Sequence, residues 1–127
     1  MLDAYFARLK ALLDRYAATP FVLLVRSDFE TRPGGQGYLS GSVIFEDAST
    51  LYFSEFLDVA LNRVDKVMYS YHYQDAENHL VFRYDNARHK PPLTFIHHKH
   101  TPGEVTSASV PDLDNVLAEI LARRGWL

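Results

Sequence analysis

The amino-acid sequence predicts a single α+β domain in which one antiparallel sheet of about five to six strands is flanked by an N-terminal and a C-terminal helix. Apolar residues recur at helical spacing at both ends of the chain, and short apolar or alternating runs fill the middle. The connections between these runs have hairpin length, which favours antiparallel pairing. A length of 127 residues fits one core, so we expect residues 1–127 to form one domain.

The two predicted helices cover residues 3–18 and 110–124. Both show apolar side chains at three- and four-residue spacing, which is typical of an amphipathic helix. Asp3 is the expected N-cap of the first helix. Pro111 suits the start of the second helix, and Gly125 suits its end. We expect both helices to cover the same face of the sheet.

The strands are predicted from β-branched and aromatic runs between turn residues. They cover residues 21–26, 38–46, 51–61, 64–74 and 79–84, with a final strand expected over 93–98. Residues 31–37 contain Pro33-Gly34-Gly35 and are expected to form a turn or mobile loop.

The hairpin over residues 64–84 has two distinct faces. A loop over 75–78 makes Ser70 face Arg83 and Tyr71 face Phe82. Alternation then gives one face, interpreted as the core side, to Tyr69, Tyr71, Tyr73, Leu80, Phe82 and Tyr84. The other face carries Ser70, His72, Arg83 and Asp85. His72 and Arg83 are expected to be diagonal neighbours that can contact one anion, although such a polar face is often simply solvated.

Composition excludes several classes of protein. The chain has no cysteine, which excludes a disulfide framework, a cysteine-ligated zinc site and thiol catalysis. No apolar run approaches the ~20 residues of a membrane span, and the charged N-terminus does not resemble a signal peptide. We therefore expect a cytoplasmic protein without membrane association. A net charge of −3 argues against a generally basic nucleic-acid binder, but a local basic segment can still attract phosphate.

The densest cationic segment lies between residues 83 and 100. Four of the six histidines fall between residues 89 and 100. They have three competing interpretations: metal ligands, general acids and bases, or phosphate-binding cations. The metal interpretation is the weakest, because no recognised ligand spacing is present. We therefore predict no metal and no cofactor.

Three motifs in the second half of the chain resemble one family. They are Tyr69-x-Tyr71-x-Tyr73, Arg83-Tyr84-Asp85-Asn86-x-x-His89 and His97-His98-Lys99-His100-Thr101-Pro102. Together they resemble the TumE family, the toxin components of bacterial and archaeal toxin–antitoxin pairs, over roughly residues 5–122. Arg88 is one departure, because a proline or a small residue is expected there. The resemblance implies a growth-inhibiting toxin of a type II system, neutralised by a cognate antitoxin and directed at RNA or translation.

The leading hypothesis is a toxin that acts on RNA as a metal-independent endoribonuclease. His72 and either His98 or His100 are the predicted acid and base, and Arg83 is predicted to stabilise the phosphorane-like charge. Asp85 is expected to fix the turn after its strand, or alternatively to orient a histidine. The predicted binding residues are Arg88, His89, His97, Lys99 and Tyr84.

Two alternatives remain open. One is a non-catalytic module that binds RNA or protein through the same basic segment. The other is a metal-dependent hydrolase with His89, His97, His98 and His100 as ligands, joined by Glu55 and Asp58. The expected partners are the antitoxin and RNA, and the oligomeric state, including a homo-oligomer, is left open.

Overall fold

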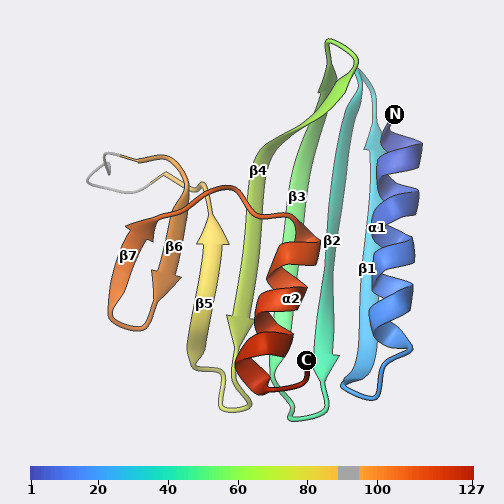
Figure 1. Ribbon diagram of the computed structural model, residues 1–127. Coiled ribbons are helices and arrows are strands. Elements are labelled where there is room, and N and C mark those ends of the chain that lie inside the picture. Colours follow the sequence, from blue (N-terminus) through green and yellow to red (C-terminus); the bar gives the residue numbers. More distant parts are fainter. Residues whose placement is uncertain (89–94) are drawn as a thin grey trace.

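The computed structural model has one antiparallel sheet with two helices on the same face (Figure 1). The structure describes residues 1–88 and 95–127. Within these residues the sheet has seven strands that follow one another in chain order. The predicted fold class is therefore confirmed, but the predicted strand number of five to six is too low.

The elements follow the chain as a simple meander between two helices. Their bounds are α1 Leu2–Ala17, β1 Val22–Arg32, β2 Gln36–Phe45, β3 Thr50–Ala60, β4 Arg63–Gln74, β5 Leu80–Asp85, β6 His98–Thr101, β7 Glu104–Ser107 and α2 Leu113–Arg124.

The β6–β7 hairpin is the part of the sheet that the sequence prediction missed. Each strand has only four residues, and all four residues of β7 are exposed, so neither strand carries an apolar alternation. Of the predicted strand over 93–98, residues 95–97 lie outside any strand, and only His98 belongs to one, as the first residue of β6. Residues 93–94 of that prediction lie outside the described residues.

Other boundaries also differ from the prediction. The loop predicted over 31–37 is shorter, because β1 and β2 extend toward each other and leave only residues 33–35 between them. Gly34 and Gly35 make this tight turn with φ of 80° and 77°, a conformation that costs glycine little. Helix α1 begins at Leu2, so Asp3 lies in its first turn and Met1 occupies the N-cap position.

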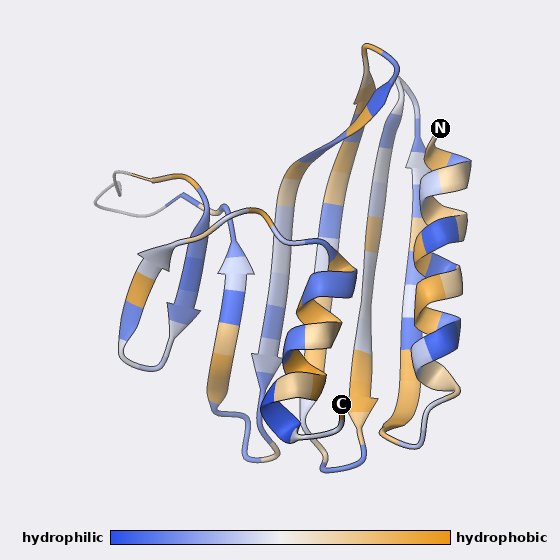
Figure 2. Cartoon of the chain, in the orientation of Figure 1, coloured by the Kyte–Doolittle hydropathy of each residue, from blue (hydrophilic) through white to orange (hydrophobic). Residues whose placement is uncertain are grey.

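The core lies between the helices and the sheet, and Figure 2 shows hydrophobic and hydrophilic residues alternating along the strands. Tyr71, Tyr73 and Phe82 are fully buried in it. This confirms that the aromatic face of the β4–β5 hairpin is the core face. Within the described residues, no helix is long and apolar enough to cross a membrane.

The register of the β4–β5 hairpin differs from the predicted one by two residues. Tyr71 pairs with Tyr84 and His72 with Arg83, and the ladder shifts between Tyr73 and Gln74. The loop is longer than expected because the Asp75 carboxylate accepts the backbone N–H groups of Glu77 and His79, which folds the loop back on itself. A shift of two residues keeps every side chain on its predicted face. His72 and Arg83 are therefore direct rather than diagonal neighbours.

Helix α2 gives a test of the packing. Leu117 is fully buried against the sheet, so Leu117→Ala should lower the free energy of unfolding by roughly 2–5 kcal/mol. The matched control is Leu61→Ala, because Leu61 is 91% exposed in the β3–β4 turn. Urea denaturation of both variants measures the difference. Equal stability of the two variants would show that α2 does not pack as described.

Candidate functional site

The sheet face opposite the helices carries two parallel rows of polar side chains. Each row consists of residues directly opposite one another on β2, β3, β4, β5 and β6. The first row is Ser42, Tyr52, His72, Arg83 and His100, and the second is Ser40, Ser54, Ser70, Asp85 and His98. Neighbouring strands lie about 4.8 Å apart, so each row spans about 19 Å across the sheet.

Small side chains hollow this face where the rows cross β2, β3 and β4. A shallow depression of about 600 Å³ is lined by the four serines of the two rows. Tyr52, His72 and Arg83 also line the depression. Tyr52 is 49% exposed, and its ring lies 6.4 Å from the His72 ring. The depression therefore combines hydroxyl groups, an exposed aromatic ring and a cation.

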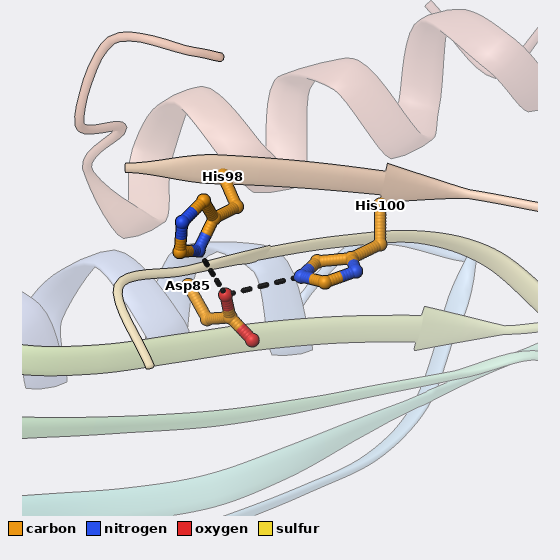
Figure 3. Close-up of side chains that lie close together, drawn as sticks. All are labelled: Asp85, His98 and His100. Carbon is orange, nitrogen blue, oxygen red and sulfur yellow. Dashed lines mark hydrogen bonds and ion pairs between the residues drawn. The ribbon is translucent and has the colours of Figure 1, made fainter. Parts of the chain in front are cut away.

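Asp85 is the centre of the polar network at the β5–β6 end of the rows. Its Oδ2 accepts a hydrogen bond from Arg83 Nε at 2.7 Å. Its Oδ1 lies 3.3 Å from His98 Nδ1 and 3.2 Å from His100 Nε2, and Figure 3 shows both imidazoles pointing at this one oxygen. Of the two roles expected for Asp85, the geometry matches the orientation of histidines.

The surroundings keep Asp85 ionised at neutral pH. Burial raises the pKa of its carboxyl, but the hydrogen bonds from Arg83, His100 and His98 lower it by more. The net pKa is below the ordinary value of 3.8. A buried carboxylate with three cationic or polar neighbours is thus a stable anion.

Both ring nitrogens of His98 face oxygen atoms that accept hydrogen bonds. Its Nε2 lies 2.8 Å from the Phe95 carbonyl oxygen, which only accepts, so Nε2 carries a hydrogen. Its Nδ1 faces the Asp85 carboxylate, which at neutral pH also only accepts. The carboxylate and the carbonyl oxygen therefore fix the orientation of the His98 ring from both sides.

His72 is arranged as a neutral imidazole. Its Nδ1 lies 3.4 Å from Arg83 Nη1, and a guanidinium can only donate hydrogen bonds. Its Nε2 lies 3.1 Å from the Gln74 side-chain oxygen. Burial lowers the pKa of His72, and the charge of Arg83 lowers it further, against the opposing effect of the hydrogen bond that His72 donates to Gln74. A neutral imidazole can accept a proton, which is the requirement for a general base.

Several predicted binding residues lie on the opposite, helix-covered face. Tyr84 donates a hydrogen bond to Glu119 at 2.5 Å, and Lys99 Nζ lies 3.2 Å from the same carboxylate. His97 Nδ1 lies 2.9 Å from the Tyr69 hydroxyl. Arg88 is exposed beyond the end of β5, and His89 lies outside the described residues.

The carboxylates proposed for the metal-site alternative do not join the histidines. Glu55 is buried on the helix face, where it accepts hydrogen bonds from Tyr5 and Tyr71 and pairs with Lys66. Asp58 pairs with Asp65 in the ladder between β3 and β4. In the described part of the chain, the group able to hold a metal near the rows is Asp85, His98 and His100, whose ligand atoms lie within 4.8 Å of one another.

Sequence reasoning placed Ser70 on the polar face but missed Tyr52 and the other three serines of the depression, Ser40, Ser42 and Ser54. A signal was present, because Ser40 and Ser42, and then Tyr52 and Ser54, stand at alternate positions of their strands. Serine and tyrosine carry no charge pattern, however, and nothing in the sequence aligned them with His72 and Arg83.

Removing the charge at Asp85 should reveal how much the network stabilises the fold. Asp85→Asn should lower the free energy of unfolding at neutral pH by about 1–3 kcal/mol, because the donors around it lose their anion. The lowered folded pKa stabilises the native state above pH 3.8, the ordinary value, and this contribution is lost as the pH falls through the folded pKa.

Urea denaturation at neutral pH and at about pH 3 measures this effect. The difference between the Asn variant and the unsubstituted chain should shrink at the lower pH. Asp28→Asn, at an exposed position of β1, is the matched control and should change little at either pH. A neutral-pH stability equal to that of the control would contradict the role of Asp85.

Comparisons with known proteins agree with the motifs in the sequence. The family model described as Toxin TumE matches residues 9–124, which is nearly the whole chain. No curated protein and no solved structure matches the chain. The match includes both rows of the open face and every motif that carried the resemblance. The chain therefore belongs to the TumE family of toxins.

Proposed function

We propose that this toxin cleaves RNA on the open face of its sheet without a metal ion, and that a cognate antitoxin neutralises it. One observation carries the proposal. The first row places His72, Arg83 and His100 directly opposite one another on three neighbouring strands. A cation thus stands between a neutral imidazole and an imidazole hydrogen-bonded to a carboxylate, which suits transfer of a phosphoryl group.

The reaction divides between these three side chains. A phosphodiester bound at Arg83 has its negative charge stabilised by the guanidinium as the phosphorane-like transition state forms. His72 takes the proton from the ribose 2′-hydroxyl, whose oxygen then forms a bond to phosphorus. The bond from phosphorus to the 5′-oxygen breaks, and that oxygen takes a proton from His100. The products are a 2′,3′-cyclic phosphate and a 5′-hydroxyl end.

Burial separates the roles of the two histidines beside Asp85. The His98 side chain is only 3% exposed, whereas that of His100 is 19% exposed. His100 is therefore the one that reaches a bound phosphate. His98 positions Asp85, and through it the imidazole of His100.

Because the chain belongs to a toxin family, we expect a partner protein that neutralises it. A growth assay tests the two proteins together. Expression of the chain alone in a bacterial host should slow growth, and co-expression of its antitoxin should restore it. Arg83→Ala and His100→Gln should abolish toxicity, because a charge-stabilising donor contributes about 10²–10³-fold in rate and an acid or base about 10²–10⁴-fold. Arg63→Ala is the control, since Arg63 is exposed at the far end of β4 from the site and pairs only with Asp65 among the described residues.

The matching assay in vitro uses a labelled RNA, with and without chelator, beside the same RNA carrying 2′-deoxyribose at the cleaved position. We expect the unmodified RNA to be cleaved equally well with and without chelator. The RNA with 2′-deoxyribose should stay intact. Binding without cleavage would favour the non-catalytic module, and loss of cleavage with chelator would favour the metal-dependent hydrolase. Fully toxic, folded Arg83 and His100 variants would remove this row from the mechanism.

The exposed ring beside the row predicts how the RNA is held. We expect a base to stack on Tyr52, with its phosphate at Arg83. Tyr52→Ala should weaken binding of single-stranded RNA by about 1–3 kcal/mol, the usual contribution of one stacked base. Tyr52→Phe, which keeps the ring, should bind nearly as well. Fluorescence anisotropy measures both variants, and equal affinity of the Ala variant would place the RNA elsewhere.

A further inference from the structure

We propose that Asp85, His98 and His100 also form a binding site for a divalent transition metal ion of the zinc class. These side chains also serve the proposed reaction, but the metal site is inferred from their geometry alone. One carboxylate oxygen and two imidazole nitrogens converge, and this donor set suits zinc and its neighbours in the first transition row.

The distances match those between ligands of one metal ion. Zinc bonds to nitrogen and oxygen are about 2.0–2.2 Å long, so two tetrahedral ligands lie about 3.4 Å apart. Asp85 Oδ1 lies 3.3 Å from His98 Nδ1 and 3.2 Å from His100 Nε2 (Figure 3). All three ligand atoms lie within 4.8 Å of one another, so small side-chain rotations complete the triad.

The neighbours of the triad act as a supporting shell. Ligating histidines usually donate their other ring N–H to a carbonyl or carboxylate, which leaves the ligating nitrogen free of hydrogen. His98 makes such a contact through Nε2 to the Phe95 carbonyl oxygen, 2.8 Å away. Arg83 holds the other oxygen of Asp85 at 2.7 Å and fixes the carboxylate.

His100 is the most accessible of the three proposed ligands. The side chains of Asp85 and His98 are 5% and 3% exposed, whereas His100 is 19% exposed. A metal ion therefore enters past His100, and three protein ligands leave a fourth position for water. A metal ion on Nε2 of His100 occupies the nitrogen that faces Asp85 and leaves the ring without the second proton that it would give to the leaving oxygen. Metal binding should therefore inhibit the proposed cleavage.

The chain contains a built-in control. Asp75, Glu77 and His79 form a second group of close ligand atoms in the β4–β5 loop. There the Asp75 carboxylate already accepts two backbone N–H groups, and the His79 side chain is 76% exposed. We expect this group to contribute nothing measurable to zinc affinity.

Isothermal titration of the metal-free full chain with zinc chloride at neutral pH tests the site. We expect one zinc ion per chain, with affinity lowered more than about 100-fold by His98→Gln or His100→Gln, because supporting-shell changes alone cost 10–100-fold. His79→Gln should bind as tightly as the unsubstituted chain. Circular dichroism of each variant checks folding, and His100→Gln, at the more exposed position, keeps the test decisive if His98→Gln unfolds.

Absence of stoichiometric binding, or equal affinity in His100→Gln, would overturn the proposal. An RNA cleavage assay separates it from the proposed function. Inhibition by zinc that a chelator reverses supports both. Cleavage that requires zinc keeps the metal site and overturns metal-free cleavage. Chelator-insensitive cleavage by a chain that binds no zinc overturns the metal site alone.

Discussion

The open face depends on the hydrogen bonds of one buried carboxylate, that of Asp85. Asp85 is the last residue of β5. Its contacts join β5 to β6, and a long connection separates these two strands in the sequence. Arg83 holds one of its oxygens, and His98 and His100 converge on the other. A buried charge is costly unless it is paired, so these contacts are mutually required.

The helix-covered face makes the open face available for function. Its tyrosines bury their rings and still satisfy their hydroxyls, as Tyr71 does with Glu55 and Tyr73 does with Ser49. Among the described residues, every buried side-chain nitrogen and oxygen has a hydrogen-bond partner. The core therefore needs nothing from the opposite face, and polar side chains there can face a ligand instead.

Alternation made the faces of the sheet predictable from sequence, and the outcome for Tyr71, His72 and Arg83 confirms it. Register was less predictable, because the side chain of Asp75 shapes the β4–β5 loop. The convergence on Asp85 was unpredictable in detail, since it depends on β5 pairing with β6 across residues that leave no hairpin signal. Tyr52 was missed for a related reason, because only the three-dimensional pairing aligns it with His72.

The period of two also explains why the histidine tract is not one site. His98 and His100 point to the open face, while His97 and Lys99 point to the helix face. Lys99 pairs with Glu119 on α2, and His97 contacts Tyr69 on β4. These contacts attach the short strand β6 to the core on the helix-covered face of the sheet. His97 and Lys99, which the sequence analysis predicted as binding residues, thus hold in place the two imidazoles that reach Asp85.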